Sequence, residues 1–351
     1  MWHIRPFARN TEPKLRSFIP ASFLLLAIGI LSARALGQRQ DQNVERPMAG
    51  PRATVIQETS LYVSPDRGST RMERVPEGRE MVVAERNGPW VRVFANTDAP
   101  DENKNDAPTL GDDAHPIPVT GWMEAKAVLE ETTPNGDLIL MGEAATMESL
   151  ASDARGPRNA GQAARLLYQR LIEFYPGSPL AAEAAWRAAD IRWQFDKADL
   201  ARLPSAKEKE AWLRQHMDES ELRKVIKLWP RSRQADLAAY DLIDNKICGD
   251  WQGDPRCPEK EAQIYEDYAT RHPTGPRTAQ ALYQAAWRMA VLHDIYAADG
   301  NDKKTRDALN EARNLAQFME KTFPASDYSA RAATLVYKIR NSITVYGYGE
   351  N

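Results

Sequence analysis

The sequence contains very little cysteine and histidine, which metal sites and many catalytic sites need. Its 351 residues include two cysteines and five histidines. The histidines stand far apart, without metal-ligand spacing, and are His3, His115, His216, His272 and His293. A zinc-protease helix, a nucleophile elbow and a phosphate-binding glycine loop are also missing. These absences favour a non-enzymatic protein that uses no cofactor and no metal ion.

A surplus of either charge is also missing. The chain has 46 basic and 49 acidic residues, for a net charge of −3. Because phosphate backbones and anionic lipids are held by strong cationic fields, this balance argues against a nucleic-acid partner. The hydrophobic share of 42% is enough to build the cores of two ordinary domains.

Long apolar runs are missing apart from one near the N-terminus. Basic residues precede "FIPASFLLLAIGILSA" at 18–33, and small residues follow in an A-x-A arrangement at Ala33 and Ala35. This pattern predicts a secretory signal peptide over residues 1–35. The run is shorter than the roughly 20 residues that span a bilayer, which favours cleavage over a retained anchor. We therefore expect an exported protein of the periplasm or cell envelope, with membrane contact only if the segment is retained.

The two cysteines stand close together, at Cys248 and Cys257 in "ICGDWQGDPRC". In an oxidising compartment such a pair favours a disulfide, whereas a metal site would need further ligands that the loop lacks. We predict a Cys248–Cys257 disulfide.

A small β unit is predicted after a tether. Residues 36–52 are polar, with proline and glycine and no periodicity, as in a tether. From Ala53 on, short runs rich in valine, threonine and aromatic residues alternate with turns such as "PEG" and "NGP". Glycine and asparagine suit the positive backbone angles of tight turns, and the alternation suits half-buried strands. Residues 53–130 are expected to form an antiparallel all-β unit.

The ordered turn motifs resemble those of bacterial SH3-like domains. "LYVSPDRGST", "VPEGREMVVAERNGPWVRV" and "TGWMEAKAV" follow one another as in that family, with Gly78 and Gly88 at turns. The resemblance implies a small β-barrel, and members of the family commonly bind cell-wall peptides or proteins. The candidate groove residues are Tyr62, Trp90 and Trp122. Alternatively, a barrel this small needs large aromatic residues simply to fill its core.

The chain departs from the SH3-like pattern at residues 96–119, an acidic, proline-containing insertion where the family has a tight turn. Its carboxylates suggest calcium, but the spacing lacks the central glycine and the bidentate glutamate of an EF-hand loop. We expect a solvated loop and no metal site.

The second half repeats one unit four times: an aromatic residue or histidine, a proline, serine or glycine two residues later, and alanine eight residues after the proline. The copies are "YPGSPLAAEAAW", "WPRSRQADLAAY", "HPTGPRTAQALY" and "FPASDYSARAAT". Proline ends the preceding helix, and serine or glycine caps the next. Alanine lets a neighbouring helix approach closely. Each unit predicts a helical hairpin that buries its apolar face only by stacking.

These hairpins resemble tetratricopeptide-type repeats, in particular the variant with a terminal aromatic–proline pair in outer-membrane assembly lipoproteins and related cell-envelope proteins. The resemblance covers residues 156–345 and implies protein binding. The chain departs from that pattern in its proline spacings of 54, 43 and 51, which exceed the regular 34-residue period, and in lacking a lipid-anchoring cysteine.

Three aromatic residues stand ten positions after a repeat proline: Trp186, Tyr240 and Tyr283. At about 100° per residue they lie roughly opposite the alanine of the same helix. Either they line a concave groove that holds a partner's peptide, or they pack against the adjacent repeat.

The sequence as a whole predicts an SH3-like β-barrel followed by an all-α, TPR-like solenoid. A linker at 131–155 joins two separately folding units, and a tail follows at 346–351. The favoured hypothesis is a non-enzymatic cell-envelope adaptor that binds protein or peptide partners through the solenoid, with the SH3-like domain as a second binding module. The alternative is a peptidoglycan-targeted accessory protein related to cell-wall hydrolases.

Overall fold

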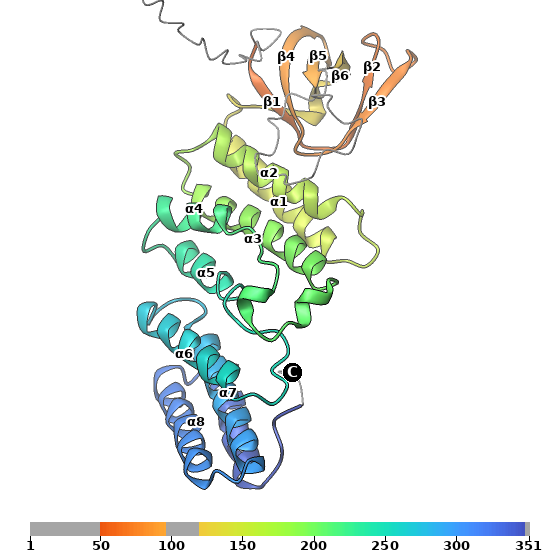
Figure 1. The fold of residues 1–351 in the computed structure, drawn as a ribbon. Helices are drawn as coiled ribbons and strands as arrows, with labels where there is room; N and C mark the ends of the chain where they lie inside the picture. Colours follow the sequence, from red (N-terminus) through yellow and green to blue (C-terminus); the bar gives the residue numbers. More distant parts are fainter. Residues whose placement is uncertain (1–49, 96–118, 348–351) are drawn as a thin grey trace, which may run out of the picture. The chain divides into compact units, whose positions relative to one another are not determined.

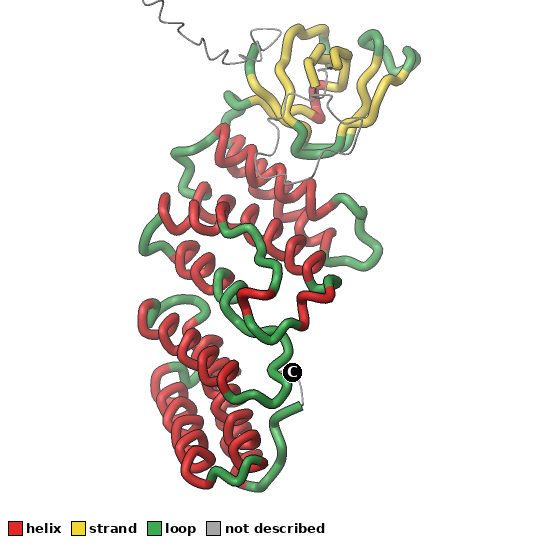
Figure 2. The backbone as a smooth tube through the Cα atoms, viewed as in Figure 1, coloured by secondary structure: helices red, strands yellow, loops and turns green. Residues whose placement is uncertain are grey.

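We analysed a computed structural model of the chain, which describes residues 50–95 and 119–347. A β-sheet comes first in the chain and helices follow (Figures 1 and 2). This order confirms the predicted succession of a β unit and a helical region. Four predicted segments lie wholly or mainly outside the described residues: the signal peptide, the tether, the acidic insertion and most of the tail.

The described part of the sheet contains seven antiparallel strands. They are β1 (Arg52–Val55), β2 (Thr59–Tyr62), β3 (Arg71–Val75), β4 (Glu80–Asn87), β5 (Trp90–Ala95), β6 (Val119–Glu124) and β7 (Val128–Glu130). Their order is β3-β2-β6-β5-β4-β1-β7. Because β3 and β7 end this order without pairing with each other, the described strands form an open sheet, and closure into a barrel is not shown.

One face of the sheet carries its core, as the alternation in the sequence predicts. Small and branched side chains fill it, among them Val55, Leu61, Val83 and Val93, together with Met81 and Met123. The tight turn between β4 and β5 needs the positive backbone angle of Gly88, which has φ 56°. The large aromatic residues Tyr62, Trp90 and Trp122 are not members of this core.

The described helical region contains nine α-helices. They are α1 (Gly136–Ala151), α2 (Ala160–Phe174), α3 (Ala181–Leu200), α4 (Ser220–Leu228), α5 (Arg233–Asp241), α6 (Arg256–Arg271), α7 (Thr278–Ala298), α8 (Asp302–Thr322) and α9 (Asp327–Arg340). Short 3-10 helices lie at Ala125–Ala127, Pro204–Lys207 and Ala211–Leu213. Among the described residues, none of these helices is long and apolar enough to cross a membrane.

The four repeat units form four hairpins, α2/α3, α4/α5, α6/α7 and α8/α9. The residue before each repeat proline ends its helix in the same way. At Tyr175, Trp229, His272 and Phe323, φ lies between −124° and −129° and ψ between 53° and 59°, and the amide donates to the carbonyl four residues earlier. An extended residue before proline is expected, since the proline ring clashes with a helical predecessor. The shared geometry confirms that the motif is a structural repeat.

The repeat alanines are the most deeply buried residues of their helices. Ala184, Ala238, Ala281 and Ala332 are each 0% exposed, as expected where helices approach closely. The predicted serine caps are found at α5 and α9, where Ser232 and Ser326 accept hydrogen bonds from backbone amides. In the other two copies the predicted caps, Ser178 and Gly275, lie in the turn before the helix.

The segment expected to be a linker, 131–155, contains helix α1. Leu140 and Ala144 of α1 are fully buried and pack in one core cluster with Leu129 of β7 and Leu167 of α2. Apolar contacts therefore run continuously from the last strand through α1 into the first hairpin. Separate folding of the β and helical regions stays a prediction.

Candidate functional site

The predicted sheet aromatics gather on the face of the sheet opposite its core. Residues directly paired in antiparallel strands project to the same side. Tyr62 of β2 pairs with Trp122 of β6, Trp122 pairs with Arg92 of β5, and Trp90 pairs with Glu124. The structure thus brings the three candidates, Tyr62, Trp90 and Trp122, together on neighbouring strands. We call these five residues the aromatic face.

A cavity of about 590 Å³ lies at the end of the aromatic face. Pro65, Pro89 and Trp90 form its apolar walls, and charged side chains from the β2–β3 turn and the end of β6 complete the lining. The ring of Tyr62 meets Trp90 edge to face, with centroids 5.5 Å apart and planes at 86°. This arrangement is favourable for aromatic pairs and fixes the Trp90 ring beside the cavity.

Three charged residues around the cavity form one ion-paired group. Glu124 accepts from Arg67 and from Lys126, whose Nζ lies 2.9 Å from a Glu124 oxygen. These hydrogen bonds, the one from Arg67 first, lower the pKa of Glu124 to about 2. Glu124 is thus charged at neutral pH. Sequence reasoning missed this group, although Glu124 and Lys126 stand two and four residues after Trp122.

The site combines two proline rings, a tryptophan edge and fixed charges of both signs. Rigid rings offer large apolar area at low entropic cost, and paired charges at the rim give orientation and specificity. Such a surface can receive an extended peptide segment that carries apolar and charged side chains.

The helical aromatics contact the following hairpin or a neighbouring helix. Trp186 of α3 donates from Nε1 to Asp241 of α5, at 3.1 Å. Tyr240 of α5 packs against Tyr268 of α6, with centroids 5.2 Å apart. Tyr283 of α7 is only 6% exposed, and its ring lies 5.7 Å from Tyr328 of α9. Of the two interpretations that the sequence left open, this geometry favours packing between repeats.

A pair of carboxylates lies beside these rings, on α3 and α5. Burial raises the pKa of Asp241 to about 7, and the nearby charge of Asp190 adds to the effect. Burial likewise raises the pKa of Asp190, which accepts a hydrogen bond from Gln194. We therefore expect the contact between α3 and α5 at Asp241 to change with pH.

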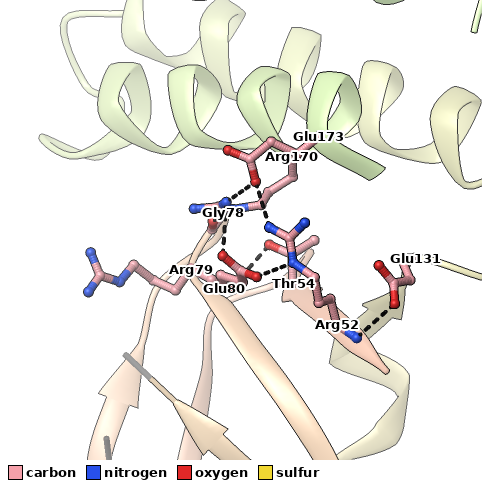
Figure 3. Close-up of polar contacts among 8 residues, drawn as sticks. All are labelled: Arg52, Thr54, Gly78, Arg79, Glu80, Glu131, Arg170 and Glu173. Atoms are coloured by element: carbon pink, nitrogen blue, oxygen red, sulfur yellow. Dashed lines mark hydrogen bonds and ion pairs between the residues drawn. The ribbon is translucent and has the colours of Figure 1, made fainter. Parts of the chain in front are cut away.

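The sheet and helix α2 are joined by a partly buried polar network (Figure 3). Arg170 of α2 donates from Nε to the carbonyl of Gly78, at 3.1 Å, and from Nη1 to Glu80 of β4, at 3.3 Å. Arg52 of β1 pairs with Glu80 and also with Glu173, which in turn binds Arg170. Two arginines and two glutamates thus bridge the two regions.

Two features of position 78 favour glycine over any residue with a side chain. Its φ of 81° lies in the region that side chains disfavour. A Cβ atom added there would lie 2.4 Å from the Cβ of Leu166 on α2. The sequence marked Gly78 as a turn residue but gave no sign that a helix lies against it.

The cysteines form the predicted disulfide, Cys248–Cys257, with Cα atoms 6.0 Å apart. It joins the segment after α5 to the first turn of α6. His272, in the aromatic slot of its repeat, stacks on Tyr268 and pairs with Asp236, at 2.7 Å.

Comparison with known proteins yields little. No protein-family model matches the chain, and no curated protein matches it. Among solved structures, one described as "DHF79 filament" shares 16% sequence identity over 59% of this chain and 97% of its own, with a TM-score of 0.22.

Proposed function

We propose that this chain is a non-enzymatic adaptor of the cell envelope that holds a protein or peptide partner. The observation that carries the proposal is the aromatic face, where Tyr62, Trp90 and Trp122 lie together beside a cavity of about 590 Å³. Aromatic residues in partly exposed pockets are the usual anchors of protein recognition. The aromatic face is the first receiving surface in this proposal, and the helical hairpins form the second.

The two resemblances support this function. Gly78 and Gly88 sit at positive-φ turns, where an SH3-like domain needs them. The four hairpins with a common helix end and fully buried alanines match the construction of a TPR-like solenoid. We therefore propose an SH3-like domain followed by TPR-like repeats. The insertions after α3 and α5 lengthen the first two proline spacings, and the 21-residue helices α7 and α8 lengthen the third.

Export is the third part of the proposal. The disulfide is consistent with an oxidising compartment, and the N-terminal pattern of a signal peptide points the same way. The periplasm or another exported envelope compartment suits both features.

A capture experiment tests the adaptor function. The exported chain would be cross-linked in envelope extracts, and captured proteins would be identified and then purified. We expect a defined protein to be captured by the native chain and by a Trp212→Ala control, and to be lost with Trp90→Ala. Trp212 suits the control because it is 67% exposed and lies in a short 3-10 helix between two hairpins, outside both proposed receiving surfaces. Equal capture by all three chains would contradict a role for the aromatic face.

The rival function is a peptidoglycan-targeted accessory protein. The same cavity supports it, because the residues that line the cavity also suit a peptide of the cell wall. Sedimentation with purified peptidoglycan distinguishes the two. Binding to peptidoglycan that depends on Trp90, without capture of any protein, would favour the rival.

A further inference from the structure

The two insertions that lengthen the repeat are joined into one substructure. We call residues 201–219 the α3–α4 segment and residues 242–255 the α5–α6 segment. The amide of Gly249 donates to the carbonyl of Glu208, at 3.1 Å. A Cβ on Gly249 would lie 2.4 Å from that oxygen, so glycine permits this backbone approach. The insertions are therefore fitted to each other and not independent loops.

A buried amide and the disulfide hold this substructure in place. Asn245 accepts from the amide of Met217 and donates to the carbonyl of the same residue, both at 3.0 Å. The α5–α6 segment is also tied to α6 by Cys248–Cys257. Walls held by buried hydrogen bonds and a covalent link are suited to a preformed binding site.

A cavity of about 240 Å³ lies between the two segments and the end of α3. Its apolar lining includes Leu200, Met217 and Ile247, and its charged lining includes Lys197, Arg214 and Asp244. The volume is below the roughly 300 to 1,000 Å³ of sites for drug-sized molecules, yet many times what one water needs. It suits a ligand the size of an amino acid or a dipeptide.

The cavity carries one positive charge that no described carboxylate balances. Asp244 pairs with Lys197, at 2.9 Å, and accepts from Trp193, at 3.2 Å. Arg214 donates from Nη1 only to the carbonyls of Ile247 and Cys248. Its Nε is shielded from solvent and has no acceptor among the described residues. Because Nε is out of reach of a water-sized probe, a ligand would meet the charge of Arg214 at Nη2, which makes no hydrogen bond to a described residue.

The remaining donor has a specific chemistry. The Nη1 atom of Arg214 is engaged by backbone and Nε is shielded, so Nη2 is the part of the guanidinium left for a ligand. An N–H of a charged guanidinium donates a short, charge-assisted hydrogen bond to a carboxylate oxygen. We propose that this cavity binds a small carboxylate, either a free acid or the end of a peptide chain, with Arg214 as the residue that recognises the anionic group.

This assignment is tested by measuring the binding of defined probes to the full exported chain with ligand-observed NMR. N-acetyl-L-alanine presents a carboxylate, and N-acetyl-L-alaninamide has nearly the same shape without the charge. We expect the acid to bind at least about tenfold more tightly than the amide, as for the loss of a charge-assisted hydrogen bond. Equal binding of acid and amide would overturn the proposal. So would no binding of the acid at about 10 mM, where a ligand of millimolar affinity is mostly bound.

Variants connect the binding to Arg214 and to the cavity. Arg214→Gln should weaken acid binding at least about tenfold. Arg202→Gln is the matched control, because Arg202 lies in the same segment, is exposed, and is not part of the lining. Ala206→Leu fills the cavity while leaving Arg214 and its carbonyl partners in place, so it should also abolish binding. This second variant keeps the test decisive if Arg214→Gln fails to fold. Unchanged binding in Ala206→Leu would overturn the site.

A longer probe distinguishes the two sources of the carboxylate, a chain end and a free small acid. N-acetyl-trialanine with a free carboxylate would bind more tightly than acetylalanine if the cavity receives a chain end, and not at all if it receives a free small acid. The test is independent of the aromatic face, so its failure leaves the adaptor proposal standing.

Discussion

Replacing Arg170 by methionine should lower the free energy of unfolding more than any change to an exposed ion pair does, because Arg170 joins the sheet to the helices. The Arg170 side chain is 6% exposed, and that of its partner Glu80 is 8% exposed. Methionine keeps most of the apolar stem but removes the hydrogen bonds to Glu80, Glu173 and the Gly78 carbonyl. Removing one partner of a buried pair costs about 3 to 5 kcal/mol. Since Glu80 keeps its pairing with Arg52, we expect about 3 kcal/mol.

Urea denaturation, followed by tryptophan fluorescence and by circular dichroism, measures this loss. Arg223→Met is the matched control, because Arg223 is 65% exposed in its pair with Glu219, and such surface pairs contribute about 0 to 1 kcal/mol. If Arg170→Met and Arg223→Met lose the same free energy of unfolding, the network does not hold the two regions together.

The remaining predictions concern the repeat, the disulfide and the pH response. Tyr283→Ala should cost about 3 to 5 kcal/mol of unfolding free energy and leave partner capture intact; lost capture without lost stability would contradict its packing role. Reduction of Cys248–Cys257 should cost roughly 2.5 to 3 kcal/mol, from the chain entropy of a loop of about ten residues, and urea curves with and without reductant measure it. Because the folded state raises the pKa of Asp241 to about 7 from its ordinary value of 3.8, the unfolding free energy should fall as pH rises between about 4 and 7. Asp241→Asn should flatten that fall, and an unchanged pH profile would contradict the assignment. Limited proteolysis should cut at residues 131–135 or 152–159 and spare α1; cleavage within α1 would contradict its burial.

The helical half was largely predictable because its signals are local. Proline cannot continue a helix past its first turn, and the four prolines at 176, 230, 273 and 324 each follow a helix end by two residues. The fully buried alanines also follow from the sequence period alone. The two insertions were visible only as surplus length, since the hydrogen bond from Gly249 to Glu208 joins residues that no sequence pattern connects.

The structural features that the sequence did not indicate depend on contacts between residues far apart in the chain. The proline, glycine and polar residues of 131–155 favour a linker, although residues 144–154 also suit a helix. The burial of Leu140 in one cluster with Leu129 and Leu167 depends on residues outside that segment. Arg170 reads as an ordinary polar residue of an amphipathic helix, yet it lies against Gly78, 92 positions away. Tyr62, Trp90 and Trp122 were named from the sequence, whereas their position on one face and the ion-paired group of Arg67, Glu124 and Lys126 depend on strand register.

Photo-cross-linking from the sheet itself tests the central claim most directly, that the aromatic face receives a partner protein. Benzoylphenylalanine in place of Arg92 would stand on that face, paired in register with Trp122. In place of Arg331, on the exposed side of α9, it provides the matched control. We predict that irradiation in envelope extracts yields a defined protein adduct from position 92 and none from position 331, with the adduct lost when Trp90→Ala is added. Protein adducts from position 331 alone, or only peptidoglycan fragments from position 92, would contradict the claim.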